Sequence, residues 1–229
     1  MRVVVLSSGG KDSVYAHWWA TLQGWDVISL ITCKIINDDS MMFQIPGTQI
    51  VELQSKVTNT NYLEFQLTGN EESEMLELSN FITDLMKEGE VLHGLDGIVT
   101  GALRSDYQKS RIELMCNTLE ICSFSPLWHN NSYEHMKNLI EDGFKLILSS
   151  VSCDGLDKSW IGEIIDNENL NKLASISKEY RFNIDGEGGE FETSVIDAPH
   201  FTSGIHVEGN KIWDKGRGFF EFTTLKINN

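Results

Sequence analysis

The residues best suited to do chemistry lie near the start of the chain, in one segment: Ser7, Ser8, Gly9, Gly10, Lys11, Asp12 and Ser13. A β-branched run precedes it and a helical pattern over residues 14–20 follows it, which predicts a strand, a glycine turn and a helix. Backbone N–H groups of a glycine loop that opens a helix converge on one point, and the helix dipole favours a polyphosphate there. The serines would add hydroxyl donors, Lys11 a positive charge, and Asp12 a ligand for Mg²⁺.

The spacing of this segment is neither the G-x-x-x-x-G-K-[ST] of a Walker A loop nor the G-x-G-x-x-G of a dinucleotide site. It resembles the PP-loop of ATP pyrophosphatases, Ser-Gly-Gly-x-Asp-Ser, which grips the pyrophosphate that leaves when ATP becomes AMP. The alternative is an ordinary glycine-rich turn with a capping Ser or Asp. All six motif positions are present directly after an N-terminal strand, and this context favours the phosphate loop.

A second polar segment spans residues 101–111, after a predicted strand and at a predicted helix start. Gly101 opens it, and Ser105 would donate a hydrogen bond to phosphate. The residues that would neutralise phosphate charge are Arg104, Lys109 and Arg111, and Asp106 would cap the helix or help to hold a metal. The alternative is a capped amphipathic helix with a solvated basic face.

Three carboxylates, those of Glu187, Glu190 and Glu192, stand on a glycine-rich stretch near the C-terminus. In an extended chain Glu190 and Glu192 would share a face, with Phe191 on the other. Such a platform would bind a metal or an ammonium group, or orient a backbone segment of a substrate. The alternative is a plain acidic surface loop.

Aromatic and histidine side chains give weaker signals. Trp128 or Trp160 together with the glutamates would form a cage for a quaternary ammonium group, although a tryptophan of this kind more often belongs to the core. Neither His129 nor His135 has a sequence neighbour that indicates a metal site or a catalytic triad.

The elements that must position these residues follow from hydrophobic patterning. Apolar runs over residues 26–32, 62–67 and 95–101 predict further strands, alternating with helical patterns. Such alternation favours parallel βαβ units and a doubly wound α/β sheet, whose ligands lie beyond the carboxyl ends of the strands. The loops after Leu6, Thr32 and Thr100 should therefore face one crevice, and Thr32 joins the expected nucleotide contacts.

The C-terminal part of the chain has a different character. Beyond about residue 155 the pattern breaks into short helical pieces, a hairpin over residues 206–213 and a strand over 219–227. We therefore expect an ATP-binding domain of residues 1–154 and a smaller α+β lobe of residues 155–229 on the substrate side.

Composition narrows the class of protein. The 229 residues carry 18 Lys and Arg against 34 Asp and Glu, a net charge of −16, which opposes the phosphate neutralisation that RNA binding needs. The four cysteines form no Cys-x-x-Cys pair, so neither zinc nor disulfides are expected. The apolar runs are shorter than the roughly 20 residues of a membrane helix, and no signal-peptide pattern is seen. We expect a cytoplasmic protein.

Taken together, five segments look like the diphthine–ammonia ligase family, and they occur in the family's order over essentially the whole chain. They are residues 8–13, residues 101–111 with Tyr107 and Gln108, Pro126-Leu127-Trp128, residues 156–162, and the Glu-Gly-Gly-Glu-Phe-Glu-Thr stretch 187–193. The first segment alone would indicate only the PP-loop superfamily. The glutamate-rich stretch is far more discriminating.

The resemblance implies a two-step amidation. ATP would adenylate the carboxylate of diphthine, a modified histidine of translation elongation factor 2, and ammonia would then displace AMP to leave diphthamide. It assigns residues 7–13 to the phosphates and Mg²⁺, with Lys11 and Asp12 catalytic and Asp12 the metal ligand. Arg104, Ser105 and Arg111 go to the phosphates or adenylate, and the three glutamates go to the diphthine or ammonia side.

Other functions stay open at this point. The chain could be another PP-loop enzyme, either a small-molecule amidase or a tRNA-modifying ligase, or a sensor that binds ATP or AMP without turnover. Bacterial relatives of the same short form exist in cells without diphthamide, so the substrate is less fixed than the chemistry. Whether the chain forms a homo-oligomer does not follow from its sequence.

Overall fold

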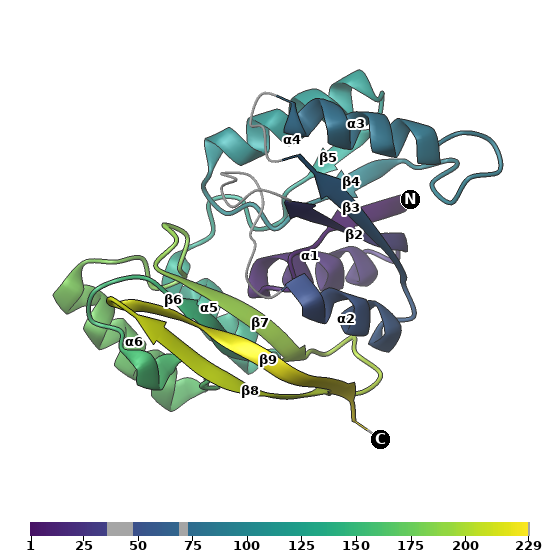
Figure 1. Cartoon of the computed structure of the whole chain (residues 1–229). Coiled ribbons are helices and arrows are strands. Elements are labelled where there is room, and N and C mark those ends of the chain that lie inside the picture. The colour runs from purple at the N-terminus through teal and green to yellow at the C-terminus, as the bar shows by residue number, and fades with distance from the viewer. Residues whose placement is uncertain (36–47, 69–72, 229) are drawn as a thin grey trace.

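Two β-sheets with helices packed around them make up the computed structural model (Figure 1), which describes residues 1–35, 48–68 and 73–228. The first sheet comes from the N-terminal half of the chain and the second from the C-terminal half. No described helix is both long and apolar enough to cross a membrane.

The first sheet has five parallel strands in the order β3-β2-β1-β4-β5. The strands are β1 (Arg2–Leu6), β2 (Asp26–Ile35), β3 (Asn61–Leu67), β4 (Gly97–Val99) and β5 (Cys122–Phe124). The helices between them are α1 (Lys11–Leu22), η1 (Thr48–Ile50), α2 (Val51–Val57), α3 (Glu74–Leu85) and α4 (Asp106–Thr118).

Both faces of this sheet are covered, which explains the unbroken Val3-Val4-Val5 run. Val4 packs with α3 and α4, whereas Val3 and Val5 pack with α1 and α2 on the opposite face, and all three side chains are fully buried. Successive strand residues point to opposite faces, so a strand buried on both faces has no polar alternation. The expected doubly wound α/β fold is confirmed.

The second sheet is antiparallel, with strand order β7-β6-β9-β8. Its strands are β6 (Lys145–Val151), β7 (Phe191–Asp197), β8 (Ile205–Asp214) and β9 (Arg217–Ile227), and its helices are α5 (Ser132–Glu141), η2 (Lys158–Trp160) and α6 (Asn167–Tyr180). The hairpin expected within residues 206–213 is wrong, because these residues form one continuous strand, β8, with a register shift rather than a turn at Gly209. The chain turns instead at Lys215 and Gly216, both with positive φ, and β8 pairs with β9. The proposed boundary at residue 154 falls after β6, whereas the change of sheet lies before it.

Helix α1 belongs to both halves. Ala16 and Ala20 pack in the core of the parallel sheet, while Val14 is buried in the core of the second sheet, with Tyr15 and Trp18 against it. Apolar residues on opposite sides of a helix are typical of a helix that is buried between two layers, as α1 is here. Because α1 begins directly after the glycine loop, this packing places the loop between the two sheets.

Candidate active site

The glycine loop has the backbone geometry of an anion site. Gly9 has a φ of +82°, and a Cβ there would lie 2.6 Å from Ile50 Cγ2, so only glycine fits. The Gly9 carbonyl accepts hydrogen bonds from Val195 N and Gln54 Nε2, both at 3.0 Å. The first bond of α1 runs from Val14 N to the Gly10 carbonyl. The amides of Asp12 and Ser13 precede it and point out of the helix start, where they can bind an anion.

Lys11 and Asp12 form an ion pair in the first turn of α1, with Nζ 2.8 Å from Oδ2. The other oxygen of Asp12, Oδ1, lies 2.8 Å from Nε2 of His135. Burial opposes both charges, but the pair outweighs it, so the pKa of Lys11 is raised and the pKa of Asp12 is lowered by Lys11 and His135. Both groups of the pair are therefore charged at neutral pH.

Gly101 lies against this turn. A Cβ on Gly101 would stand 2.5 Å from the carbonyl carbon of Asp12 and 2.7 Å from Ser13 N. The glycine therefore lets the β4–α4 segment approach the helix start closely. Gly101 thus packs against the backbone of Asp12 and Ser13, beside the expected phosphate position.

Thr32 supports the loop from behind. It lies inside β2, which continues to Ile35, and its buried hydroxyl donates to the Ser7 carbonyl at 2.9 Å. The strand is longer than its sequence pattern predicts, so Thr32 is not at a strand end. Ser7 and Ser13 lie near each other on the opposite side of the loop, with their hydroxyl oxygens 3.4 Å apart.

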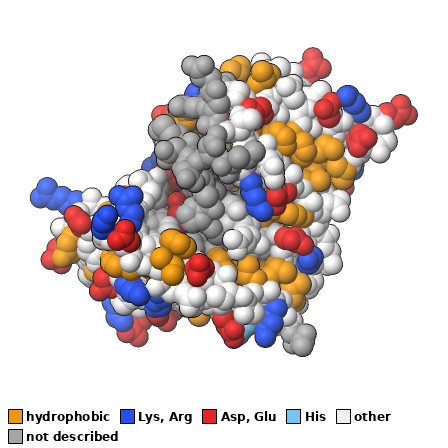
Figure 2. Space-filling model, viewed as in Figure 1, with side chains coloured by type: hydrophobic (Ala, Val, Ile, Leu, Met, Phe, Trp, Pro, Cys, Tyr) orange, Lys and Arg blue, Asp and Glu red, His pale blue; other side chains and the backbone are white. Residues whose placement is uncertain are grey.

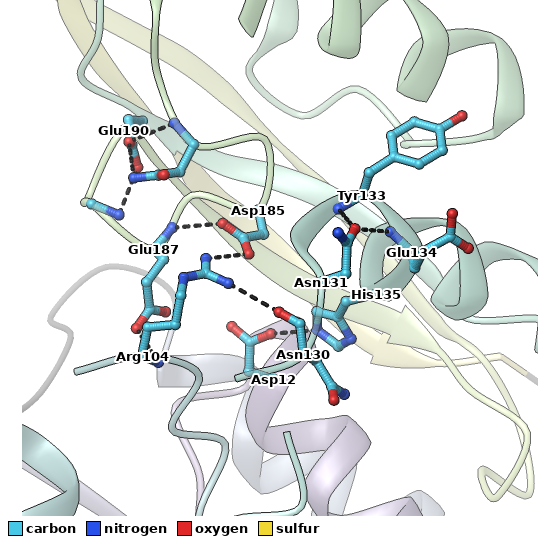
Figure 3. Close-up of polar contacts among 12 residues, drawn as sticks. Asp12, Arg104, Asn130, Asn131, Tyr133, Glu134, His135, Asp185, Glu187 and Glu190 are labelled. Carbon is cyan, nitrogen blue, oxygen red and sulfur yellow. Dashed lines mark hydrogen bonds and ion pairs between the residues drawn. The ribbon is translucent and has the colours of Figure 1, made fainter. Parts of the chain in front are cut away.

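Arg104 joins the two halves of the molecule. One guanidinium nitrogen forms an ion pair with fully buried Asp185, another donates to the Asn130 carbonyl at 3.2 Å, and the Arg104 amide donates to Glu187 Oε1 at 3.0 Å (Figure 3). The guanidinium thus holds the glutamate-rich loop. A bound phosphate would have to share it with Asp185.

The other polar residues of the 101–111 segment have local partners. Ser105 is the N-cap of α4, and its hydroxyl accepts from Gln108 N. The guanidinium carbon of Arg111 lies 3.8 Å from the centre of the Tyr107 ring. The alternative of a capped helix therefore describes part of this segment.

The three glutamates differ in their surroundings. Glu190 accepts hydrogen bonds from Asn183 N, Asn183 Nδ2 and Gly188 N at 2.7–2.8 Å and closes its own loop. Glu187 and Glu192 are half-buried near the Lys11–Asp12 pair, and burial raises the pKa of both, that of Glu192 to about 7. Phe191 packs into the second core.

The two tryptophans make contacts of their own. Lys109 Nζ lies 5.0 Å from the centre of the Trp128 ring, and the His129 ring stacks on Trp128 at 4.8 Å. Trp160 packs against the core of the second sheet. Lys109 thus occupies a cation position over Trp128 that the cage hypothesis gave to a substrate.

Four residues of the site escape prediction from the sequence: His135, Asp185, Thr193 and Gln54. Their partners are distant in sequence: His135 meets Asp12 across 123 residues, and Thr193 Oγ1 accepts from Lys11 N across 182. Gln54 Nε2 donates to both the Gly9 and Val195 carbonyls. No spacing signal marks such contacts. Thr193 is the last residue of the glutamate-rich stretch and Asp185 lies just before it, but the pattern gives neither residue a role.

Asp12 is the residue best suited to hold Mg²⁺. Across residues 1–35, 48–68 and 73–228, no group of three or more His, Cys, Asp and Glu side chains is arranged to hold a metal. Mg²⁺ commonly binds through one or two carboxylates together with substrate phosphates. Each oxygen of Asp12 has a second lone pair beyond those facing Lys11 and His135, so the residues present fit an ion that arrives with a nucleotide.

Family models divide the chain as the two sheets do. The diphthamide synthase N-terminal domain matches residues 1–123, and the diphthamide synthase C-terminal domain matches residues 131–227. The first match contains the glycine loop and the parallel sheet, and the second contains His135 and the glutamate-rich loop. Together the two matches include the residues of the site described above except Trp128, His129 and Asn130, which lie between them.

Named relatives agree with these models. A Mus musculus protein named diphthine–ammonia ligase is 30% identical, with 92% of this chain aligned to 84% of the relative. The Bos taurus protein of the same name is 29% identical, over 93% of this chain and 85% of the relative. A solved structure described as a predicted subunit of tRNA methyltransferase from Methanocaldococcus jannaschii aligns with a TM-score of 0.44 at 18% identity, over 87% of this chain and 98% of that one.

Proposed function

Since the chain belongs to the diphthamide synthase family, we propose that it is a diphthine–ammonia ligase. It uses ATP to convert the carboxylate of diphthine on translation elongation factor 2 into the amide of diphthamide, and releases AMP and pyrophosphate. Ammonium is the nitrogen source, and the reaction takes place in the cytoplasm.

One observation carries the proposal. A buried Lys11–Asp12 ion pair at the start of α1 faces the half-buried carboxylates of Glu187 and Glu192 from the other half of the molecule. The first pair suits the phosphates of ATP, and the glutamates suit a cationic partner. Nucleotide and amine sites therefore adjoin, as an amidation through a nucleotide intermediate requires.

In the first step the loop binds and orients ATP. The amides of Asp12 and Ser13, together with the Lys11 ammonium group, stabilise the negative charge that develops on the departing pyrophosphate. The diphthine carboxylate attacks the α-phosphorus, and the resulting acyl-adenylate has AMP as a good leaving group. Mg²⁺ held by Asp12 would supply further charge neutralisation at the phosphates.

In the second step ammonia displaces AMP. Glu187 and Glu192 lie on the second sheet's side of the site, where they attract ammonium. The raised pKa of Glu192, about 7, lets its carboxylate exchange a proton near neutral pH. A proton acceptor is needed because only unprotonated ammonia carries the lone pair that forms the amide bond.

The test is to incubate the protein with labelled ATP, Mg²⁺ and ammonium, with and without diphthine-bearing elongation factor 2, and to separate AMP from ADP. We expect AMP only when that factor is present, and a loss of at least about 100-fold in Asp12→Ala. Asp84→Ala, which removes an exposed carboxylate paired with Lys87, is the matched control and should retain activity.

Each other function predicts a different result. A sensor would bind ATP tightly and form no AMP under any condition. A PP-loop enzyme with a small-molecule substrate would form AMP without the factor, and an RNA-modifying enzyme would show salt-sensitive RNA binding. ADP in place of AMP would contradict the assignment of the glycine loop itself.

A further inference from the structure

Both carboxylate oxygens of Asp12 have a partner, and the two partners come from different halves of the molecule. Oδ2 lies 2.8 Å from Nζ of Lys11, its neighbour in α1, and Oδ1 lies 2.8 Å from Nε2 of His135 in α5. A carboxylate held at both oxygens cannot rotate about its terminal torsion. The plane of the Asp12 carboxylate is therefore fixed before any ligand binds; Figure 3 shows its contact with His135.

The His135 ring is itself rigidly held. Its residue is 3% exposed, its amide donates to the Asn131 carbonyl in the first turn of α5, and the Asn131 side chain caps that turn by accepting from Tyr133 N and Glu134 N. The Tyr15 ring of α1 meets the imidazole edge to face at 5.6 Å. The ring thus has a fixed position relative to both helices.

The direction of the hydrogen bond follows from the charge of Asp12. Asp12 is ion-paired with the Lys11 ammonium group, and a carboxylate in such a pair accepts hydrogen bonds and donates none. The proton of this contact is therefore on Nε2 of His135. Such a bond leaves the outer lone pairs of Asp12 free for a further ligand, and it fixes the direction in which they point.

We propose that His135 is a positioning residue, through which the second half of the molecule orients Asp12 toward the phosphates and Mg²⁺ of bound ATP. The proposal rests on the nucleotide-binding role given to Asp12 in the proposed function. Outer partners of metal ligands typically change metal affinity or activity by about 10–100-fold when removed. His135 would act in this way without touching nucleotide or substrate.

The experiment compares His135→Ala and His135→Gln in the full chain. The Gln amide nitrogen reaches about as far as Nε2 of histidine and can donate the same bond. Mn²⁺ replaces Mg²⁺ as the probe, and its affinity for the protein saturated with a non-hydrolysable ATP analogue is measured by electron paramagnetic resonance. His93→Gln is the matched control, because His93 is exposed and its backbone carbonyl, rather than its ring, accepts from Arg2.

We expect His135→Ala to weaken Mn²⁺ affinity by about 10–100-fold, and His135→Gln to recover most of this loss. A ring ¹⁵N spectrum of the wild-type protein should show His135 protonated at Nε2 before and after the nucleotide binds. His135→Gln should also restore the Mg²⁺ concentration at which AMP formation is half-maximal.

Wild-type Mn²⁺ affinity in His135→Ala would overturn the proposal, and so would a folded His135→Gln that binds Mn²⁺ no better than the alanine variant. Should His135→Ala not fold, the glutamine variant and the Nε2 spectrum still decide, because an unprotonated Nε2 contradicts the bond direction. A wild-type protein that binds Mn²⁺ and ATP analogue but forms no AMP would refute the proposed reaction and leave the His135 test intact.

Discussion

Glu192 shows how a single residue at this site is held at a cost to stability. Its half-buried carboxylate adjoins Glu187 and Asp12, and burial raises its pKa from an ordinary 4.5 to about 7. A carboxylate whose pKa is higher in the folded state binds protons more tightly there, so stability decreases as pH rises from about 4.5 to 7. At pH 8 the ionised group opposes folding.

We therefore predict that Glu192→Gln raises the free energy of unfolding at pH 8 by about 1–3 kcal/mol while lowering activity. The gain should shrink as the pH falls from 7 and disappear below pH 4.5, where the wild-type carboxyl becomes protonated in both states. Urea denaturation at pH 5 and pH 8 measures the difference, and Glu221→Gln on exposed β9 serves as control. A variant less stable than the wild type at pH 8 would contradict this account.

Gly101 tests whether close packing beside the helix start matters. Gly101→Ala places a methyl group 2.5 Å from the Asp12 carbonyl carbon, which backbone atoms cannot avoid by rotating a side chain. We expect a loss of about 1–3 kcal/mol in stability, as for other overpacked sites, and weaker ATP binding. Calorimetry measures both quantities.

Gly24→Ala is the comparison for Gly101→Ala. Gly24 has a φ of +71° with open space around its Cα, so alanine there costs about 1 kcal/mol of backbone strain without any clash. We expect its ATP affinity to equal that of the wild type. Equal ATP affinities in Gly101→Ala and the wild type would mean that the close approach has no bearing on the phosphate site.

At the scale of elements, α1 meets the segment between β7 and β8 through two histidines, buried His17 and half-buried His200. The rings of His17 and His200 lie 4.6 Å apart in a T-shaped arrangement, and neither nitrogen of His200 has a hydrogen-bond partner among the described residues. Burial lowers the pKa of His17 to about 3 and that of His200 to about 4. Both rings are neutral wherever the protein is folded at neutral pH.

This contact predicts acid sensitivity. Because the unfolded histidines bind protons near pH 6.5 and the folded ones do not, the stabilisation is complete above pH 6.5 and decreases as pH falls toward 4. Each histidine should cost about 2 kcal/mol at pH 5. We expect His200→Phe to reduce the stability difference between pH 7.5 and pH 5, as measured by urea denaturation.

His93→Phe, at an exposed histidine of the first sheet's half, is the control and should show the wild-type pH dependence. A pH dependence unchanged in His200→Phe would mean that the histidine contact opens before the protein unfolds. In that case α1 would detach from the second sheet in a local opening, while its packing against the first sheet stayed intact.

Elements were predictable from the sequence where local pattern determines structure. The strand, glycine loop and helix over residues 2–22 follow from β-branched residues, glycines and an apolar helix, and the parallel sheet follows from strands that alternate with helices. Local pattern does not predict which of the two sheets contains β6. Its apolar run is buried on both faces like β1, and burial alone does not distinguish a parallel from an antiparallel partner.

The site was predictable to a similar extent. Residues within one motif, such as Lys11 and Asp12, are adjacent in sequence and in space. Glu190 and Arg104 have recognisable types, but their partners depend on how the second half packs, and His135 has no local signal at all. Tertiary contacts decided those roles, and the sequence pattern contains none of that information.

At the scale of the whole molecule, the charged surface and the packing of α1 between the two sheets play different roles. On the described part of the face in Figure 2, Lys and Arg side chains are scattered among Asp and Glu, which is typical of a solvated surface. The function of the molecule instead depends on its interior, where α1 packs against both sheets. The two halves therefore form one cooperative site.

The cross-contacts at the glycine loop make the last prediction. Lys11 N donates to Thr193, Val195 N donates to the Gly9 carbonyl, and Asp12 contacts His135. The second half of the molecule therefore supplies a hydrogen-bond partner to three residues of the glycine loop and helix start. We expect a fragment of residues 1–130 to bind an ATP analogue at least about tenfold more weakly than the full chain, since each lost hydrogen bond contributes about 1 kcal/mol.

Co-expression with residues 131–229 provides the control, because α1 can then pack between both sheets and the loop regains its partners. Titration calorimetry compares the isolated fragment, the reassembled pair and the intact chain. Full affinity in the isolated fragment would show that the first half shapes its loop alone. Recovery only in the pair would show that packing between the halves, rather than the glycine motif by itself, creates the phosphate site.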